Sequence, residues 1–284
     1  MELTKQALYT ILATFLVFGN SDLLADGSDE ASNKSVKRIL LIGQSPDGHP
    51  RATHEYIPAA RLLAECLNRI EQTQTLIVNA DEPWKEGPEL LDGADAAVVF
   101  VSEGAKWLRN DRSRLAAFQA LAKRRGGLVC LHWGMGTKKA KNIADFVALF
   151  GGCHGGPDRK YKVVDVTTRI VSPGHPIVNG VGPLKIRDEF YYTLKFAKPQ
   201  QSISPLVQVP IDGKLHTVGW AFQRPDGGKS FGFSGCHFHE NWKHTEYRRL
   251  AVQAILWSVG RPIPKDGVDV TVNEKLLALP PKAR

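Results

Sequence analysis

The first half of the chain alternates between short apolar runs and longer amphipathic stretches. The run VKRILLIGQ at residues 36–44 is typical of a strand buried on both faces, whereas AARLLAECL within residues 57–70 has the spacing of a helix with one buried face. This alternation, β-α-β-α-β-α-β-α, predicts a parallel, doubly wound α/β sheet with helices on both faces. The other strands of this half are expected in TLIVN, ADAAVVFVS and GLVCLHWGMG, and the other helices in DRSRLAAFQALAKRR and AKNIADFVALF.

After Gly152 the pattern changes to strands separated by turn signals such as RPDGG. The sequence therefore predicts extra strands in the C-terminal half, added to the mainly parallel sheet of the first half. They are expected in YKVVDV, LKIRDEFYYTL, SPLVQV, LHTVGWAF and KSFGFSG, followed by a closing helix in TEYRRLAVQAILWSVG.

Residues 1–25 have the features of a signal peptide. An apolar run from Ala7 to Gly19 is too short to span a bilayer comfortably, and Ala25 offers a small residue for cleavage. A lone membrane anchor is the alternative, but charge returns soon after the run, at Asp22. We therefore expect an exported protein, periplasmic or extracellular, with no integral membrane domain beyond this segment. The expected organisation is a signal peptide (1–25), a flexible leader (26–35), one α/β domain (36–262) and a C-terminal tail (263–284).

The formal net charge of +8 is spread over short basic patches. The patches LAKRRGG, GTKKAKN and DRKYK have no interleaved aromatic residues and form no nucleic-acid motif, so no nucleic-acid partner is expected. No G-x-G-x-x-G follows a strand and no P-loop occurs, so no nucleotide cofactor is expected. The four cysteines share no motif spacing; pairing of Cys153 with Cys236 is permitted in an exported protein and stays open.

Polar side chains gather after the predicted strands. Ligands of open α/β sheets bind outside the carboxyl ends of the strands, and most of the nine histidines fall at this edge. The sequence therefore predicts one site there. Its candidate residues, in chain order, are His49, His54, Glu55, Glu103, His132, Cys153, His154, Asp188, Glu189, Tyr191, Tyr192, His237, His239 and Glu240.

Each candidate also has a structural interpretation. His54 could instead cap the following helix, and His132 could instead be a histidine whose hydrogen bonds are satisfied near the core. His154, in GGCHGGPD, is expected to be exposed in a turn. Glu189 has an alternative as an ion-pair partner of Arg187 or Lys185.

The pair His237 and His239 has the i,i+2 spacing that places two side chains on one side of an extended segment, as two metal ligands require. The same spacing also arises by chance. The pair alone is therefore a weak signal for a metal.

The chain resembles the trehalose-utilisation ThuA-like family of the class I glutamine-amidotransferase-like, flavodoxin-like superfamily. The resemblance rests on KRILLIG followed by THEY, on GLVCLHWGMG, on GHPIVNGVGPLKIRDEFYY, and on GKSFGFSGCHFHENWKHTEYRRLAVQAILWSVG, which together span residues 36–262. The amidotransferase relatives carry a cysteine nucleophile at the turn where this chain has His132, which implies that amidotransferase activity is absent. The HFHENW segment departs from a simpler Gly-His pattern, which leaves open whether His237 or His239 is the functional imidazole.

The resemblance implies a role in sugar metabolism around oxidised (keto) glycosides. Our first hypothesis is an enzyme, a hydrolase, lyase or isomerase, in which a divalent ion such as zinc or manganese polarises a sugar oxygen. The alternatives are a non-catalytic sugar- or metal-binding protein and a structural module, and a homo-oligomer stays open. In the enzyme, the expected ligands of the ion are His132, His237, His239 and Glu189. The groups expected to transfer a proton are Glu103, Glu189 and Glu240. The residues expected to bind the carbohydrate substrate are His54, Trp133, Tyr191, Tyr192 and Trp242.

Overall fold

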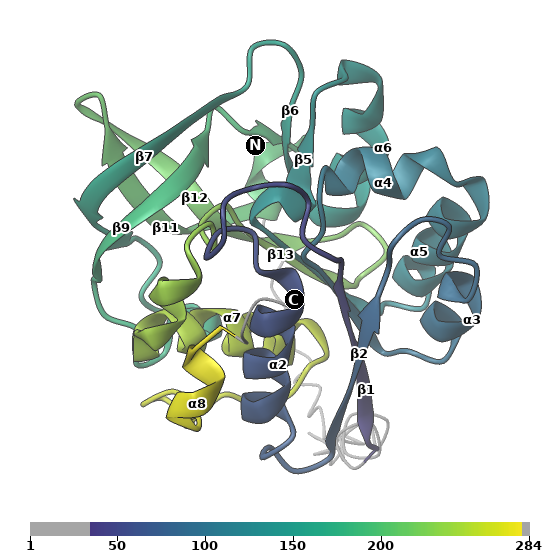
Figure 1. Cartoon of the computed structure of the whole chain (residues 1–284), viewed down its shortest axis with the longest axis horizontal. Coiled ribbons are helices and arrows are strands. Elements are labelled where there is room, and N and C mark those ends of the chain that lie inside the picture. The colour runs from purple at the N-terminus through teal and green to yellow at the C-terminus, as the bar shows by residue number, and fades with distance from the viewer. Residues whose placement is uncertain (1–34, 280–284) are drawn as a thin grey trace, which may run out of the picture. The chain divides into compact units, whose positions relative to one another are not determined.

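The computed structural model describes residues 35–279, so the predicted signal peptide and all but the last residue of the leader lie outside the described part of the chain. Its largest sheet has eight strands in the order β2-β1-β3-β4-β13-β12-β11-β8. Figure 1 labels β1, β2, β11, β12 and β13 of this sheet. The first five strands in this order run parallel, which confirms the doubly wound α/β fold. They are β1 (Lys37–Gly43), β2 (Thr73–Asn79), β3 (Ala96–Val99), β4 (Gly127–Leu131) and β13 (Lys229–Phe233).

Helices cover both faces of this sheet because side chains alternate along each central strand. In β1, Ile39 and Leu41 pack with α2 (Tyr56–Leu67) and α7 (Thr245–Ser258), whereas Leu40 and Ile42 pack in the cluster on the other face. The helices of that second face are α3 (Gly87–Asp92), α4 (Gly104–Asn110), α5 (Arg112–Lys123) and α6 (Ile143–Phe150).

The C-terminal half extends the sheet with antiparallel strands, as the sequence predicts. These are β12 (Lys214–Gln223), β11 (Ile203–Ile211) and β8 (Arg169–Ile170). Two small sheets complete the fold: β10-β6-β5, and the antiparallel pair of β7 with β9. Their strands are β5 (Gly136–Thr137), β6 (Gly152–Gly155), β7 (Lys160–Thr167), β9 (Lys185–Tyr192) and β10 (Lys195–Phe196).

The segment after residue 262 packs on the face that carries α2 and α7. Val270 is buried, and its carbonyl accepts a hydrogen bond of 2.9 Å from Nε of Arg248 in α7. A short helix, α8 (Glu274–Leu277), follows and contacts α2. Residues 263–279 therefore contribute to the core of the domain.

All four cysteines are buried and free. Cys153 lies in β6, where its thiol faces the carbonyl of Met135, while Cys236 follows β13. The disulfide that the sequence left open between these two residues is therefore not formed in this structure.

Candidate functional site

Three histidines meet at the carboxyl ends of parallel strands. His54 lies in the loop after β1, His132 directly follows β4, and His237 follows β13 by four residues. Because β1, β4 and β13 run parallel in one sheet, their carboxyl ends share an edge, and residues distant in sequence converge there.

The imidazole nitrogens of this histidine cluster (His54, His132 and His237) lie within hydrogen-bond distance of one another. Nε2 of His132 is 3.0 Å from Nε2 of His54 and 3.1 Å from Nδ1 of His237. Together the three residues form a group whose potential ligand atoms all lie within 4.8 Å of each other.

The other ring nitrogens of His54 and His132 have partners that fix the tautomers. Nδ1 of His132 donates to the carbonyl of Ser234 at 2.8 Å, and Nδ1 of His54 donates to the carboxylate of Asp47 at 3.0 Å. A neutral imidazole has one N–H, so both Nε2 atoms carry lone pairs toward each other. Two lone pairs 3.0 Å apart repel unless a proton or a cation lies between them.

Burial disfavours a proton at this position. It lowers the pKa of His132 well below the ordinary value, and the neighbouring His54 and His237 lower it further. It also lowers the pKa of His54, and with the help of His54 it lowers the pKa of His237 to about 3. The cluster is therefore neutral at physiological pH and presents lone pairs, which suits a metal ion better than a proton.

The carboxylate of Asp47 binds His54 on the side of the ring that faces away from His132. Burial alone would raise the pKa of its carboxyl group, but hydrogen bonds from His54 and Tyr56 outweigh burial and hold the pKa below the ordinary value. The hydroxyl of Tyr56 donates to Asp47 at 2.6 Å. Asp47 therefore stays ionised and orients His54, as carboxylates behind metal-binding histidines do.

The backbone holds the cluster in an unusual conformation. His54 and His132 have φ values of +53° and +45°, a left-handed region that non-glycine residues rarely adopt. The two loops are joined by backbone hydrogen bonds: N–H of His54 donates to the carbonyl of His237, and Thr53 forms a β-bridge with Phe238. Strain of this kind persists only where the surrounding structure fixes it, and it concentrates at functional sites.

Glu189 in β9 faces two members of the cluster. Its Oε1 lies 3.8 Å from Nε2 of His132 and 3.8 Å from Nδ1 of His237. Burial, together with the adjacent Asp188, raises the pKa of Glu189 to about 7. A carboxyl group with such a pKa can both take up and release a proton near neutral pH.

Tyr191, two residues further along β9, stacks on the ring of His132 with centroids 4.5 Å apart and ring planes at 20°. Its hydroxyl lies 2.9 Å from Nε2 of His132, and because the rings are nearly parallel it approaches from the face of the imidazole. The other side of Tyr191 stacks on His154, with centroids 4.0 Å apart. The three rings form a continuous wall.

A cavity of about 470 Å³ lies beside the histidine cluster. This volume is in the range of small-molecule sites. Its lining combines residues of the histidine cluster with aromatic and basic side chains from other elements. The lining residues are His49, His54, Trp133, Lys138, His154, Arg159, Tyr161, Glu189, Tyr191 and His237.

Several residues expected in the site do not line this pocket. The carboxylate of Glu103 accepts from the backbone N–H of Lys138 at 3.0 Å and pairs with Lys106 at 3.2 Å. Glu240 is exposed and 4.0 Å from Lys243. Both carboxylates are therefore directed elsewhere.

The HFHENW segment is not extended, which corrects the expectation for the i,i+2 histidine pair. A 3₁₀ turn begins at His239, so this side chain leaves the face of His237 and is buried away from the cluster. Trp242 is a core residue that contacts Tyr247, and Tyr192 points to the opposite face of β9 from Tyr191, against His216.

Sequence reasoning missed Asp47, Lys138, Arg159 and Tyr161, and it expected His154 to be exposed in a turn. His154 is in fact buried in β6 and lines the pocket. The signal for Asp47 was its position in the same loop as His54, seven residues earlier. The other residues come from segments whose approach to the pocket depends on the two small sheets.

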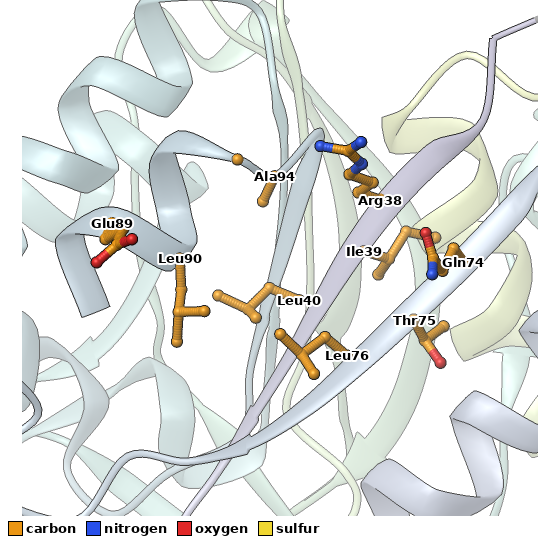
Figure 2. Close-up of a pocket in the computed structure, with 10 residues that line it drawn as sticks. Arg38, Ile39, Leu40, Gln74, Thr75, Leu76, Glu89, Leu90 and Ala94 are labelled. Atoms are coloured by element: carbon orange, nitrogen blue, oxygen red, sulfur yellow. The ribbon is translucent and has the colours of Figure 1, made fainter. Parts of the chain in front are cut away.

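A second pocket, of about 360 Å³, lies at the edge strand β2. Figure 2 shows the side chains of Leu40, Leu76 and Leu90 grouped there, with Arg38 and Glu89 at its margin. No cluster of histidines converges on it among the described residues, so the pocket beside the histidine cluster is the candidate functional site.

Comparisons with known proteins agree with this architecture. A ThuA-like protein from Bacteroides uniformis has a similar structure, with a TM-score of 0.62 and 15% identity over 82% of this chain and 95% of that chain. A cytoplasmic protein from Salmonella typhimurium matches with a TM-score of 0.52 and 17% identity, over 78% of this chain and 98% of that one. At these identities the similarity shows the fold. No curated protein sequence matches the chain.

Within residues 35–279, no helix has both the length and the apolar composition needed to cross a membrane. The sequence matches the family model ThuA, described as trehalose utilisation, over residues 46–258, which include every residue of the histidine cluster together with Asp47 and Glu189. The chain is therefore a member of the ThuA family.

Proposed function

We propose that this protein is an enzyme that acts on a carbohydrate in the pocket beside the histidine cluster, with a divalent metal ion on His54, His132 and His237. The observation that carries the proposal is the 3.0 Å approach of two imidazole nitrogens, each with its other nitrogen engaged as a donor. A positive centre between the rings would relieve the repulsion between the two lone pairs, which supports a metal ion at this position.

The residues present fit a transition-metal ion. Three imidazoles with one open position are typical of catalytic zinc sites, and ligands about 2.1 Å from zinc at tetrahedral angles lie about 3.4 Å apart. The spacings of 3.0 and 3.1 Å are close to this value. Imidazole nitrogens favour zinc over manganese, which prefers oxygen ligands. When bound, the ion supplies Lewis acidity toward a carbonyl or hydroxyl oxygen of the sugar.

Glu189 is the group that moves the proton. It reaches the cluster at 3.8 Å, and its raised pKa suits transfer in either direction near neutral pH. Trp133 and Tyr191 present aromatic rings to the pocket, which suits the apolar face of a pyranose. The proposal involves no thiol nucleophile, because Cys130 is buried inside the sheet.

The family description, trehalose utilisation, supports a sugar as substrate. We propose a keto-glycoside or related sugar as the first class to examine. The features of residues 1–25 support export to the periplasm or the outside of the cell.

The second candidate is a non-catalytic sugar- or metal-binding protein on the same scaffold. In that case the pocket carboxylate would be neutralised by a basic partner. Among residues 35–279, no lysine or arginine pairs with Glu189, which favours the enzyme.

The test is metal content by elemental mass spectrometry, on the wild type and on a His132→Ala/His237→Ala double variant. We expect about one zinc per chain in the wild type and none in the variant. A wild type that takes up no divalent ion, even after reconstitution, would refute the metal site. Loaded protein would then be screened against keto-glycosides for hydrolysis, elimination and isomerisation.

A further inference from the structure

The outer part of the pocket carries two basic side chains, Lys138 and Arg159. Both line the pocket, and Lys138 directly follows β5 while Arg159 directly precedes β7. Within residues 35–279, neither side chain forms an ion pair with a carboxylate.

The nearby acids are engaged with other bases. Glu103 accepts from the backbone N–H of Lys138 while its second oxygen binds Lys106, so it fixes the position of Lys138 and does not cancel its charge. Asp158, next to Arg159, binds Nζ of Lys195 at 2.6 Å. The charges of Lys138 and Arg159 therefore stay available to a ligand.

A third polar group completes this part of the pocket. The side chain of His154 is buried, and among the described residues its Nδ1 has no hydrogen-bond partner. Because Nδ1 is closed off from solvent, the ring nitrogen that a ligand in the pocket can reach is Nε2, which is free to form a hydrogen bond. Arg159 lies beside it, with one guanidinium nitrogen 3.2 Å from the carbonyl of Gly156.

The stacked rings relate this group to the histidine cluster. His132 stacks on Tyr191 and Tyr191 stacks on His154, so His154 lies beyond Tyr191, two ring spacings from His132. A ligand that spans this distance places one end at the histidine cluster and another end at Lys138, His154 and Arg159.

We propose that Lys138, Arg159 and His154 form an oxyanion subsite, and that the carbohydrate taken by this pocket is acidic, bearing a carboxylate or phosphate group. Arginine and lysine bind both groups through charge-assisted hydrogen bonds. Tyr161, which is exposed at the pocket margin, covers the sugar that carries the acid group. This inference rests on the proposed function, because it names the substrate class of the same site.

The test is isothermal titration of the intact protein with three matched sugars: glucuronate, glucose 6-phosphate and neutral glucose. We expect at least one acidic sugar to bind roughly ten- to a hundredfold more tightly than glucose, the gain of one charge-assisted hydrogen bond. The acid that binds more tightly identifies the group as carboxylate or phosphate. Added salt should weaken the binding of the acidic sugars and leave the binding of glucose unchanged.

Variants then locate the subsite. Lys138→Gln/Arg159→Gln should abolish the preference for the acidic sugar over glucose, whereas Lys139→Gln, the matched control, should keep this preference. Lys139 is exposed, next in the chain, and does not line the pocket. His154→Phe keeps the stacked rings but removes the ring nitrogens, so it should weaken the binding of the acidic sugar more than that of glucose.

The outcomes separate this inference from the proposed function. Equal binding of glucose and both acids would overturn the oxyanion subsite and leave a carbohydrate site in place. A preference that survives in the double variant would overturn the assignment to Lys138 and Arg159. Failure of all three sugars to bind at millimolar concentration would overturn the oxyanion subsite, and the screen with keto-glycosides would then test the proposed function separately.

Discussion

The carboxylate of Asp188 accepts a hydrogen bond from the backbone N–H of His237 at 3.2 Å. It also accepts from the backbone N–H groups of Cys236 and Phe238 and from the hydroxyl of Tyr247. A single buried carboxylate in β9 thus holds the loop that carries one member of the histidine cluster. Burial raises its pKa to about 6, although these hydrogen bonds act in the opposite direction.

Asp188→Asn should loosen this loop, because an amide group turns one acceptor into a donor that faces other donors. We expect a loss of about 2–3 kcal/mol in the free energy of unfolding and weaker metal uptake. Urea denaturation and elemental analysis measure the two effects. Asp165→Asn, at an exposed position of β7, is the control and should leave both unchanged.

Glu189→Gln should separate proton transfer from binding. The amide keeps the shape of the side chain but cannot carry a proton between substrate atoms. With a sugar that the native protein converts, we expect the turnover number to fall roughly 10²- to 10⁴-fold, with KM and metal content nearly unchanged. Loss of metal together with activity would instead make Glu189 a ligand.

His154 should make stability fall as the pH is lowered. Burial, with Arg159 and Lys195 nearby, lowers its pKa in the folded protein to about 3, from an ordinary value of 6.5. Between these values the unfolded chain binds more protons than the folded one, so this stability is present above pH 6.5 and is lost as the pH falls toward 3. At pH 5 the loss from this residue is about 2 kcal/mol relative to pH 7.

The measurement compares the unfolding free energies of the wild type and His154→Gln at pH 7 and pH 5. The comparison is needed because other groups near the pocket titrate as well: the histidine cluster acts in the same direction as His154, and the raised pKa values of Asp188 and Glu189 act in the opposite one. The variant should lose less stability on acidification. An identical loss would contradict a buried neutral His154.

Gly104→Ala should damage the turn after β4. A Cβ at this position would collide with the backbone carbonyl of Gly134, in the segment that directly follows His132. We expect a loss of about 3 kcal/mol or more, since backbone atoms cannot move aside as a flexible side chain can. Thermal melts measure the loss. In the same melts Gly174→Ala, where open space surrounds the new methyl group, should leave stability nearly unchanged.

The alternation of apolar runs was sufficient to predict the doubly wound half of the fold, because each parallel strand and its helix are local features. It missed α3 and α4, whose GPELLD and GAKWLRN sequences are short, and it placed the end of α2 at residue 70 instead of Leu67. It carried no information on the pairing of β13 with β4, since such contacts join segments about a hundred residues apart.

Strand ends were an adequate guide to His54, His132 and His237, which the structure brings together with Glu189, a residue inside β9. They failed for His239 and Glu240, because a turn replaces the extended segment on which the side-chain alternation depended. The positions of the residues of the proposed oxyanion subsite depend on strand pairings such as that of β5 with β6. This pairing spans two residues, which is too short to give a recognisable pattern in the sequence.

The position of β13 between β4 and β12 has a consequence for how the chain is made. Strand β4 is complete by Leu131, but its partner on one side is not synthesised until Lys229. Until then the nascent chain presents an open apolar edge, the kind of surface that recruits other chains. His237 arrives just after the strand that closes this edge. The histidine cluster therefore becomes complete only after the strand that covers the edge of β4 has been synthesised.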